Sequence, residues 1–192
     1  MGPVNSIEAW AKATATCRRC PGVRPGSAVL GPANGGVAAE VLFVGEAPGR
    51  LGAGRTGVPF SGDESGKRFD QLLASAGLSR ERVFVANAVL CLPLDAQGRN
   101  RTPTRTEVRA CAPWLTAILG LVGAPVVAAL GATALAALGS IEPHGLTLGK
   151  AAGRSHPWHG RELVALYHPS RQAELHRPWA RQVEDWRALN GG

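Results

Sequence analysis

The stretch VLFVGEAPGRLGAGRTGVPFSGDESG, from Val41 to Gly66, joins an apolar run to a long glycine-rich segment. The residues from Gly49 to Thr56 have the spacing of a phosphate-binding loop, with Arg55 in the place of the usual lysine. A true phosphate-binding loop opens directly into a helix whose first amides hold the phosphate. Gly57 and Pro59 follow this one, and because both disfavour the start of a helix, we expect the next helix only after them. The match to a nucleotide site is therefore interpreted as accidental.

Short β-branched runs alternate with helical stretches along the whole chain, as they do in a parallel sheet covered by helices. The predicted strands are residues 40–44, 82–86, 125–130 and 162–166. The predicted helices are residues 7–16, 65–76, 106–119, 132–138 and 179–189, while residues 144–161 are expected to be irregular or to form a hairpin. We therefore expect one α/β domain over residues 1–192, a three-layer α/β/α sandwich with a central four-stranded parallel sheet.

The composition limits the class of protein. A chain of 192 residues with 45% hydrophobic content suits one well-buried domain. The net charge of +7 comes mostly from arginine, which favours a polyanionic partner, although an arginine-rich chain with little lysine is also typical of a GC-rich genome. No apolar run is long enough for a membrane helix or a signal core, so we expect a cytoplasmic protein, in a bacterium on the nucleoid. No sustained heptad is present, and we expect a monomer.

Polar or glycine-rich segments follow all four predicted strands. Glu46 comes just after the first strand, Asn87 after the second and His168 after the last, and a Gly-Ala-Thr sequence follows the third. In an open parallel sheet the ligand crevice lies beyond the carboxyl ends of the strands. The sequence therefore predicts a pocket formed by these three side chains together with the loop of residues 50–62.

The four cysteines form a second group of candidate site residues. Cys17 and Cys20 have Cys-x-x-Cys spacing, and Cys91 and Cys111 follow much later in the chain. In a cytoplasmic protein this pattern favours a metal site over a disulfide framework. The spacing alone is compatible with a four-cysteine zinc site or with a [4Fe–4S] cluster, and it leaves open that Cys91 and Cys111 are ordinary buried thiols.

Four motifs in order carry a resemblance to a known family: GEAPG at 45–49, RTGVPFSGDESG at 55–66, VANAVLC at 85–91 and YHPSRQ at 167–172, preceded by the Cys-x-x-Cys pair. Together they resemble the uracil-DNA glycosylase superfamily, in its iron–sulfur branches, the fourth and fifth families. The resemblance covers about residues 17–172. It implies a four-stranded parallel sheet between helices, and it implies that the four cysteines hold a [4Fe–4S] cluster.

The resemblance also implies an activity and a set of roles. Such enzymes flip a deaminated base out of DNA and hydrolyse its bond to deoxyribose. Phe60 would stack on the base, Asn87 would bind the amide edge of uracil, and His168 would donate to the charge that develops on uracil O2. The backbone of the first loop would face the base or the catalytic water, at Gly45, Ala47, Pro48 and Gly49.

The chain departs from both branches, and two carboxylates therefore compete to position the attacking water. The fourth family places a further acidic residue soon after its GE-x-P-G motif, and this chain has none there. Asp63 matches the acidic residue of the fifth family, which normally has an apolar residue where this chain has Glu46 and tends to lack the asparagine found at Asn87. Asp63 is also a good candidate for the N-cap of the helix that follows it.

Two loops are expected to contact DNA. The loop between Cys91 and Cys111 resembles the variable linker of the family, and its expected DNA contacts are Asn100, Arg101 and Arg105; a solvated basic loop is the alternative. It contains no histidine for covalent trapping of an abasic sugar. The segment after His168 resembles the loop that enters the minor groove, and its expected contacts are Ser170 and Arg171.

Three functions compete. The first is a monofunctional glycosylase that releases uracil, and other deaminated bases, from DNA. The second is a non-catalytic or weakly active damage-binding member of the same fold, which the missing acidic residue after Gly49 favours. The third is a nucleotide-binding enzyme, which Gly57 and Pro59 oppose. Asn87 and His168 together favour the first.

Overall fold

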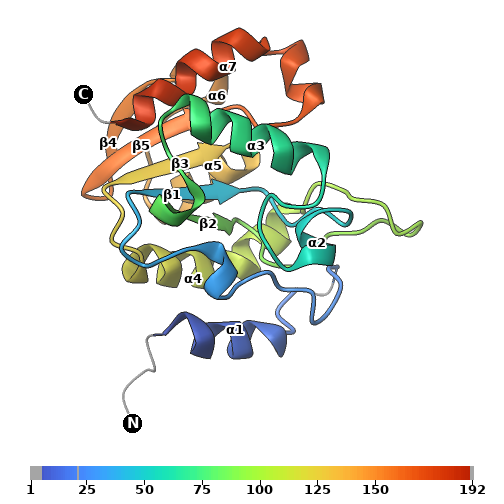
Figure 1. The fold of residues 1–192 in the computed structure, drawn as a ribbon. Coiled ribbons are helices and arrows are strands. Elements are labelled where there is room, and N and C mark those ends of the chain that lie inside the picture. The colour runs from blue at the N-terminus through green and yellow to red at the C-terminus, as the bar shows by residue number, and fades with distance from the viewer. Residues whose placement is uncertain (1–5, 21, 191–192) are drawn as a thin grey trace.

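The computed structural model describes residues 6–20 and 22–190, in which a five-stranded sheet has the order β2-β1-β3-β5-β4 (Figure 1). Four strands run parallel, and they are β1 (Val41–Gly45), β2 (Val83–Asn87), β3 (Val126–Leu130) and β5 (Arg161–Leu166). β4 (Ser155–Trp158) pairs antiparallel with β5 at one edge. The α/β class and the four parallel strands are confirmed.

The prediction of a four-stranded sheet was wrong by one strand. Residues 155–166 form a β-hairpin, the alternative that the sequence had left open for part of this region. Its turn is built by His159 and Gly160, which both have positive φ, at 52° and 68°. Because such turns reverse the chain within two residues, the hairpin adds an edge strand without changing the parallel core.

Helices cover both faces of the sheet. The longer helices, of 8 to 17 residues, are α1 (Ile7–Ala15), α3 (Glu64–Ser75), α4 (Arg105–Leu121), α5 (Ala132–Ile141) and α7 (Trp179–Trp186). Shorter elements are α2 (Ala53–Thr56), α6 (Leu148–Ala151) and the 3-10 helices η1 (Pro32–Asn34), η2 (Arg80–Arg82), η3 (Arg171–Leu175) and η4 (Arg187–Asn190). No helix among the described residues is both long and apolar enough to cross a membrane.

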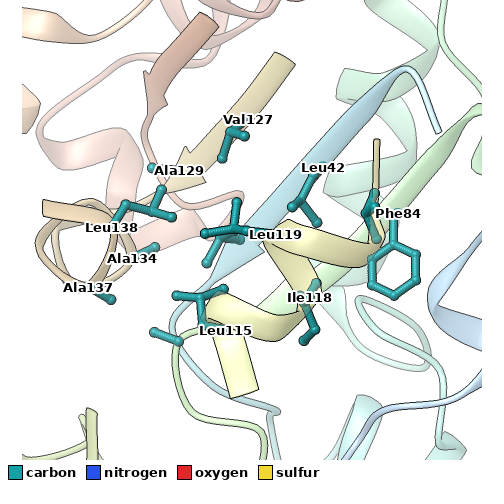
Figure 2. Close-up of a cluster of buried hydrophobic side chains, with 14 of the residues drawn as sticks. Leu42, Phe84, Leu115, Ile118, Leu119, Val127, Ala129, Ala134, Ala137 and Leu138 are labelled. Atoms are coloured by element: carbon teal, nitrogen blue, oxygen red, sulfur yellow. The ribbon is translucent and has the colours of Figure 1, made fainter. Parts of the chain in front are cut away.

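Two hydrophobic cores lie on opposite faces of the sheet, because side chains alternate along each strand. Leu42 and Val44 of β1 pack with α1, α4 and α5, and Figure 2 shows part of this core. Val41 and Phe43 pack with α3 and α7 on the other face. The three-layer arrangement predicted from the sequence is therefore present, with the sheet as the middle layer (Figure 1).

Side-chain caps fix where two helices begin. α3 begins at Glu64 because the Asp63 side chain accepts a hydrogen bond from the Gly66 amide at 2.9 Å. This is the start expected from the residues that follow the glycine-rich loop. α4 begins after Thr104, which forms a capping box with Glu107. Both caps place the preceding loops at the same edge of the sheet as the strand ends.

Candidate active site at the carboxyl edge of the sheet

A pocket of about 670 Å³ lies at the carboxyl ends of the parallel strands. The side chains that the sequence placed at this edge all line it, and they are Glu46, Phe60, Asp63, Asn87 and His168. Residues after β3 complete the wall. The structure therefore brings together residues from four strand ends and from the glycine-rich loop, as the crevice rule for parallel sheets predicts.

Asn87 is the last residue of β2 and is 4% exposed. It pairs in register with Gly45, and a Cβ at Gly45 would lie 2.5 Å from the Asn87 Oδ1 atom. Glycine at this position therefore leaves the space that the amide occupies. Among the described residues no hydrogen bond uses the Asn87 side chain, so its donor and its acceptor are both free for a ligand.

Phe60 supplies an aromatic wall. Its ring stacks on Phe69 of α3, with centroids 4.7 Å apart and an interplanar angle of 12°. The same ring lies 5.5 Å from the imidazole of His168, at an angle of 43°. Because one face of Phe60 is supported by a core residue, the ring is held rigidly where it borders the pocket.

His168 follows β5 and is largely enclosed by protein. Burial lowers its pKa from 6.5 to about 4, while the negative charge of Asp63 acts in the opposite direction. The imidazole is therefore neutral at pH 7. In that state it has one N–H to donate and one nitrogen to accept, and it brings no positive charge into the pocket.

The two candidate carboxylates have different partners. Asp63 uses Oδ1 to cap α3, and its Oδ2 atom faces the glycine-rich loop, 3.4 Å from where a Cβ of Gly49 would lie. Glu46 accepts a hydrogen bond from the Thr133 hydroxyl at 2.5 Å. Thr133 lies in the first turn of α5, and sequence reasoning singled out its Gly-Ala-Thr sequence but not the residue itself. Both carboxylates keep an oxygen atom for a further ligand.

The long loop before α4 reaches the pocket through Asn100, whose Oδ1 atom accepts a hydrogen bond from the Arg50 amide at 2.9 Å. Arg101 is used differently, because it makes two bonds to Glu107, at 2.8 and 2.6 Å, and one to the carbonyl of Gly22 at 2.6 Å. This pairing lowers the pKa of the Glu107 carboxyl. Arg101 thus fastens the loop to α4 and to the N-terminal segment.

Three other residues with a predicted DNA contact lie near the mouth of the pocket or on the surface. Ser170 lines the pocket and caps η3 through a hydrogen bond from the Ala173 amide. Arg171 is 80% exposed and lies 3.5 Å from Glu64 of α3. Arg105 is exposed in the first turn of α4. The guanidinium groups of Arg105 and Arg171 are accessible to an anionic ligand, and the role of all three residues in binding DNA stays a prediction.

Residues 32–189 match the family described as the uracil DNA glycosylase superfamily. The chain belongs to this superfamily. It is 33% identical over 175 residues to the type-4 uracil-DNA glycosylase of Thermotoga maritima, with 88% of this chain and 86% of the relative covered. It is 39% identical over 163 residues to the type-5 uracil-DNA glycosylase of Thermus thermophilus, with 73% and 69% covered. The resemblance inferred from the motifs is confirmed, including its mixture of two branches.

A solved structure supports the superfamily fold at larger distance. The crystal structure of wild-type Pedobacter heparinus SMUG2 matches with a TM-score of 0.53 and 16% sequence identity, over 81% of this chain and 77% of that one. At this identity the likeness concerns the fold alone. It places the parallel sheet and its covering helices in the architecture expected of a superfamily member.

The four cysteines of this superfamily member lie near one another. Burial raises the thiol pKa of Cys20, Cys91 and Cys111, in the last case to about 12, and the neighbouring cysteines raise each of them further. Cys111 accepts a hydrogen bond from the Leu90 amide at 3.4 Å. Within residues 6–20 and 22–190, however, no three cysteine, histidine or acidic side chains are arranged as metal ligands.

The donor set nevertheless has the chemistry of a sulfur-bound metal site. All four side chains are thiols without a disulfide, and the other three cysteines raise the pKa of the Cys111 thiol. Thiols must lose their protons to bind a metal as thiolates, and raised pKa values mean that binding would release protons. Four free thiols of the right chemistry are therefore present, but the described residues do not hold three of them in a metal-binding arrangement.

Proposed function

We propose that this chain is a uracil-DNA glycosylase, which takes uracil flipped out of DNA and hydrolyses its N-glycosidic bond to leave an abasic site. One observation carries the proposal: a free asparagine amide, a supported aromatic ring and a neutral imidazole border the same pocket as two carboxylates. A deaminated base has an amide edge, a flat face and an oxygen that gains charge as it leaves. Each feature has a partner in this pocket.

Asn87 and Phe60 would bind the base. The Asn87 amide can donate to uracil O4 and accept from uracil N3–H, which discriminates uracil from cytosine, whose amino group is a donor. Phe60 would stack on the face of the base, an interaction that every base offers and that supplies affinity more than selectivity. The backbone of residues 45–49 would border the base and the attacking water.

His168 would stabilise the leaving group. When the bond between uracil N1 and the sugar C1′ breaks, its electron pair stays with uracil and charge gathers on O2. A neutral N–H aimed at that oxygen is bonded most strongly when the charge is present, so it lowers the barrier more than it tightens binding. The oxygen atom of water then bonds to C1′ and gives up a proton to a carboxylate.

Asp63 and Glu46 would position that water. Each has one oxygen atom engaged by the protein, by the Gly66 amide and by the Thr133 hydroxyl, which orients the other atom. No lysine is among the pocket residues that the structure describes. The proposed nucleophile is water and the proposed enzyme is monofunctional, because a lyase step would need an amine at C1′.

The DNA on either side of the flipped base would contact exposed basic residues near the pocket. Arg105 and Arg171 are free at their guanidinium groups or only loosely paired, and Ser170 and Asn100 lie at the pocket wall. Arginine binds phosphate oxygens through its planar fork. The net charge of +7 would draw the protein to DNA independently of sequence.

Cys17, Cys20, Cys91 and Cys111 would hold a [4Fe–4S] cluster. The cluster would supply a cross-link between the N-terminal segment, the end of β2 and α4, and no chemistry at the base. These ligands are far apart in the sequence, so their ligation would fix the long loop between Cys91 and Cys111 that carries Asn100. The two carboxylates and His168 lie outside this group of cysteines.

The decisive experiment is cleavage of labelled oligonucleotides that contain uracil, hypoxanthine or xanthine opposite each normal base, followed by alkali to break abasic sites. We expect uracil release under single-turnover conditions, and a rate loss of about 10²–10³ in His168→Ala with nearly unchanged binding of uracil-containing DNA. We expect Asp63→Ala to lose less than His168→Ala, and Glu46→Gln to lose less than Asp63→Ala.

Two outcomes would redirect the proposal. If the protein binds uracil-containing DNA but releases no base, the damage-binding alternative replaces the enzyme. If Glu46→Gln is inactive while His168→Ala cleaves normally, Glu46 takes over the catalytic role and His168 does not stabilise the leaving group. His176→Ala is a matched control, because His176 also borders the pocket but follows no strand end.

A further inference from the structure

Phe60 has an unusual backbone conformation. Its φ is +48°, in the left-handed region that bulky side chains rarely adopt. Among the described residues only His159 shares a positive φ without being glycine, and a tight hairpin turn next to Gly160 accounts for it. No regular turn of a hairpin holds Phe60. Strained residues of this kind persist only where the surroundings enforce them, and they gather at binding and catalytic sites.

One arginine, Arg80, holds the backbone at Pro59 and Phe60 by hydrogen bonds. Arg80 donates to the carbonyl of Pro59 at 2.7 Å and to the carbonyl of Phe60 at 2.5 Å. Its third nitrogen donates to Asp70 at 2.7 Å, and its guanidinium lies 4.7 Å from the centroid of the Phe69 ring. All three nitrogens are therefore committed, and two of them fix consecutive carbonyls through the rigid fork that only arginine offers.

The first turn of α3 closes the other side of the segment. A Cβ at Gly66 would lie 2.5 Å from the carbonyl oxygen of Phe60 and 2.7 Å from its carbonyl carbon. The peptide after Phe60 thus passes in contact with the backbone of α3 on one side and bonds to Arg80 on the other. The result is a ring that stacks on Phe69 and borders the pocket.

We infer that Arg80 is a positioning residue, which acts through Phe60 to fix the aromatic wall of the base pocket. Arg80 itself does not line the pocket. The inference rests on the proposed role of Phe60 in stacking on uracil. Without the two carbonyl bonds, Phe60 relaxes toward a negative φ, and because the ring direction follows from φ, the ring leaves the face of the base.

The test compares Arg80→Gln with Arg82→Gln. Arg82 belongs to the same 3-10 helix, η2, and is a surface arginine as well, but its bonds run to Glu40 and to the carbonyl of Gly77. We expect Arg80→Gln to raise KM for uracil-containing DNA and the inhibition constant of free uracil about fivefold, the low end of what base stacking is worth. The turnover number should change much less, and Arg82→Gln should behave as wild type.

Two further variants separate the carbonyl bonds from the charge of Arg80. Asp70→Asn removes the ion pair and keeps both carbonyl bonds, so it should leave uracil inhibition unchanged. Arg80→Lys can bond one carbonyl at a time and should lie between wild type and Arg80→Gln. Thermal unfolding shows whether Arg80→Gln folds normally. If it does not, Arg80→Lys still tests the role of the two carbonyl bonds.

Crystal structures of Arg80→Gln and Arg80→Lys give a readout that needs no activity. A negative φ at Phe60 in either variant supports the inference, and a φ that stays near +48° in both overturns it. The inference is also overturned if Arg80→Gln lowers kcat by as large a factor as it raises KM. It is overturned as well if Arg82→Gln raises KM as much as Arg80→Gln does. If wild type neither releases nor binds uracil, the proposed function fails, while the φ of Phe60 still decides whether Arg80 holds the loop.

Discussion

Protonation of His168 should make the stability of this protein depend on pH in a way that a single substitution removes. Burial lowers the pKa of His168 from 6.5 to about 4 in the folded chain. At a pH between these two values, the His168 side chain is protonated in the unfolded chain but not in the folded chain. The stabilisation is therefore fully present above pH 6.5 and is lost as pH falls from there toward 4. His168→Gln has no such proton to bind.

The size of the effect follows from the two pKa values. With a pKa of 6.5 unfolded and about 4 folded, the loss between pH 7 and pH 5 is about 2 kcal/mol, and the limit at still lower pH is about 3.4 kcal/mol. For a small protein with a stability of roughly 5–15 kcal/mol, this fraction is easily measured. The charge of Asp63 opposes the shift, so its removal should lower the pKa of His168 further.

Urea unfolding at pH 7, 6 and 5 gives the free energy of unfolding of wild type and of His168→Gln. The difference between the two proteins isolates His168, because the carboxylates titrate in both and their contribution cancels. We expect wild type to lose about 2 kcal/mol more than the variant between pH 7 and pH 5. His176→Gln, at an exposed histidine, controls for the loss of a histidine as such. Equal slopes in wild type and His168→Gln would refute the reasoning, because the pKa of His168 would then be the same in the folded and the unfolded chain.

Four other predictions concern the pocket and the cysteines. Asn87→Asp should slow uracil release on the order of 10²-fold, because an ionised carboxylate has no donor for O4 and repels the leaving anion; full activity in a single-turnover assay would contradict the pocket assignment. Gly45→Ala should impair uracil binding with little loss of folded protein, since its Cβ would lie 2.5 Å from Asn87 Oδ1, and uracil inhibition measures this. Cys111→Ala should lower iron content from about four atoms per chain and lower the unfolding temperature more than the rate of the folded fraction; stoichiometric zinc in the wild-type protein would rule out the cluster. Asp63→Asn should keep its helix cap and reduce the excision rate, whereas Asp63→Ala should lose about 1 kcal/mol of stability as well.

The sequence predicted the pocket because its residues obey a rule of position. Glu46 and His168 follow a strand and Asn87 is the last residue of one, and the carboxyl ends of parallel strands share one edge. The start of α3 could also be predicted from the sequence, since Gly57 and Pro59 disfavour an earlier helix start and Asp63 is a good N-cap residue. Local chemistry was sufficient in all of these cases, and the strand boundaries and the starts of the predicted helices differ from the observed ones by at most one residue.

The edge strand β4 and the hydrogen bonds of Arg80 to the Pro59 and Phe60 carbonyls could not be predicted from local sequence signals. β4 contains Pro157 and exposed polar residues, and it forms because β5 lies beside it, not because its own residues favour a strand. Arg80 looks like any surface arginine in the sequence, and its role depends on carbonyls twenty residues earlier in the chain. The ion pair of Arg101 with Glu107 could not be read from the charge pattern either, and the DNA contact expected of Arg101 stays a prediction.

Asp63 shows why local signals and function coincide at this edge of the sheet. A helix begins where a side chain accepts a bond from a free amide, and a catalytic water is held where a carboxylate oxygen is fixed in direction. The bond from the Gly66 amide satisfies the first need with one oxygen of Asp63 and thereby orients the second. The cap also sets the start of α3, and Gly66 in its first turn leaves room for the strained Phe60 peptide. A single helix start therefore aligns the carboxylate proposed to position the water with the aromatic wall, so that substitutions in SGDES should disturb both together unless they preserve the cap.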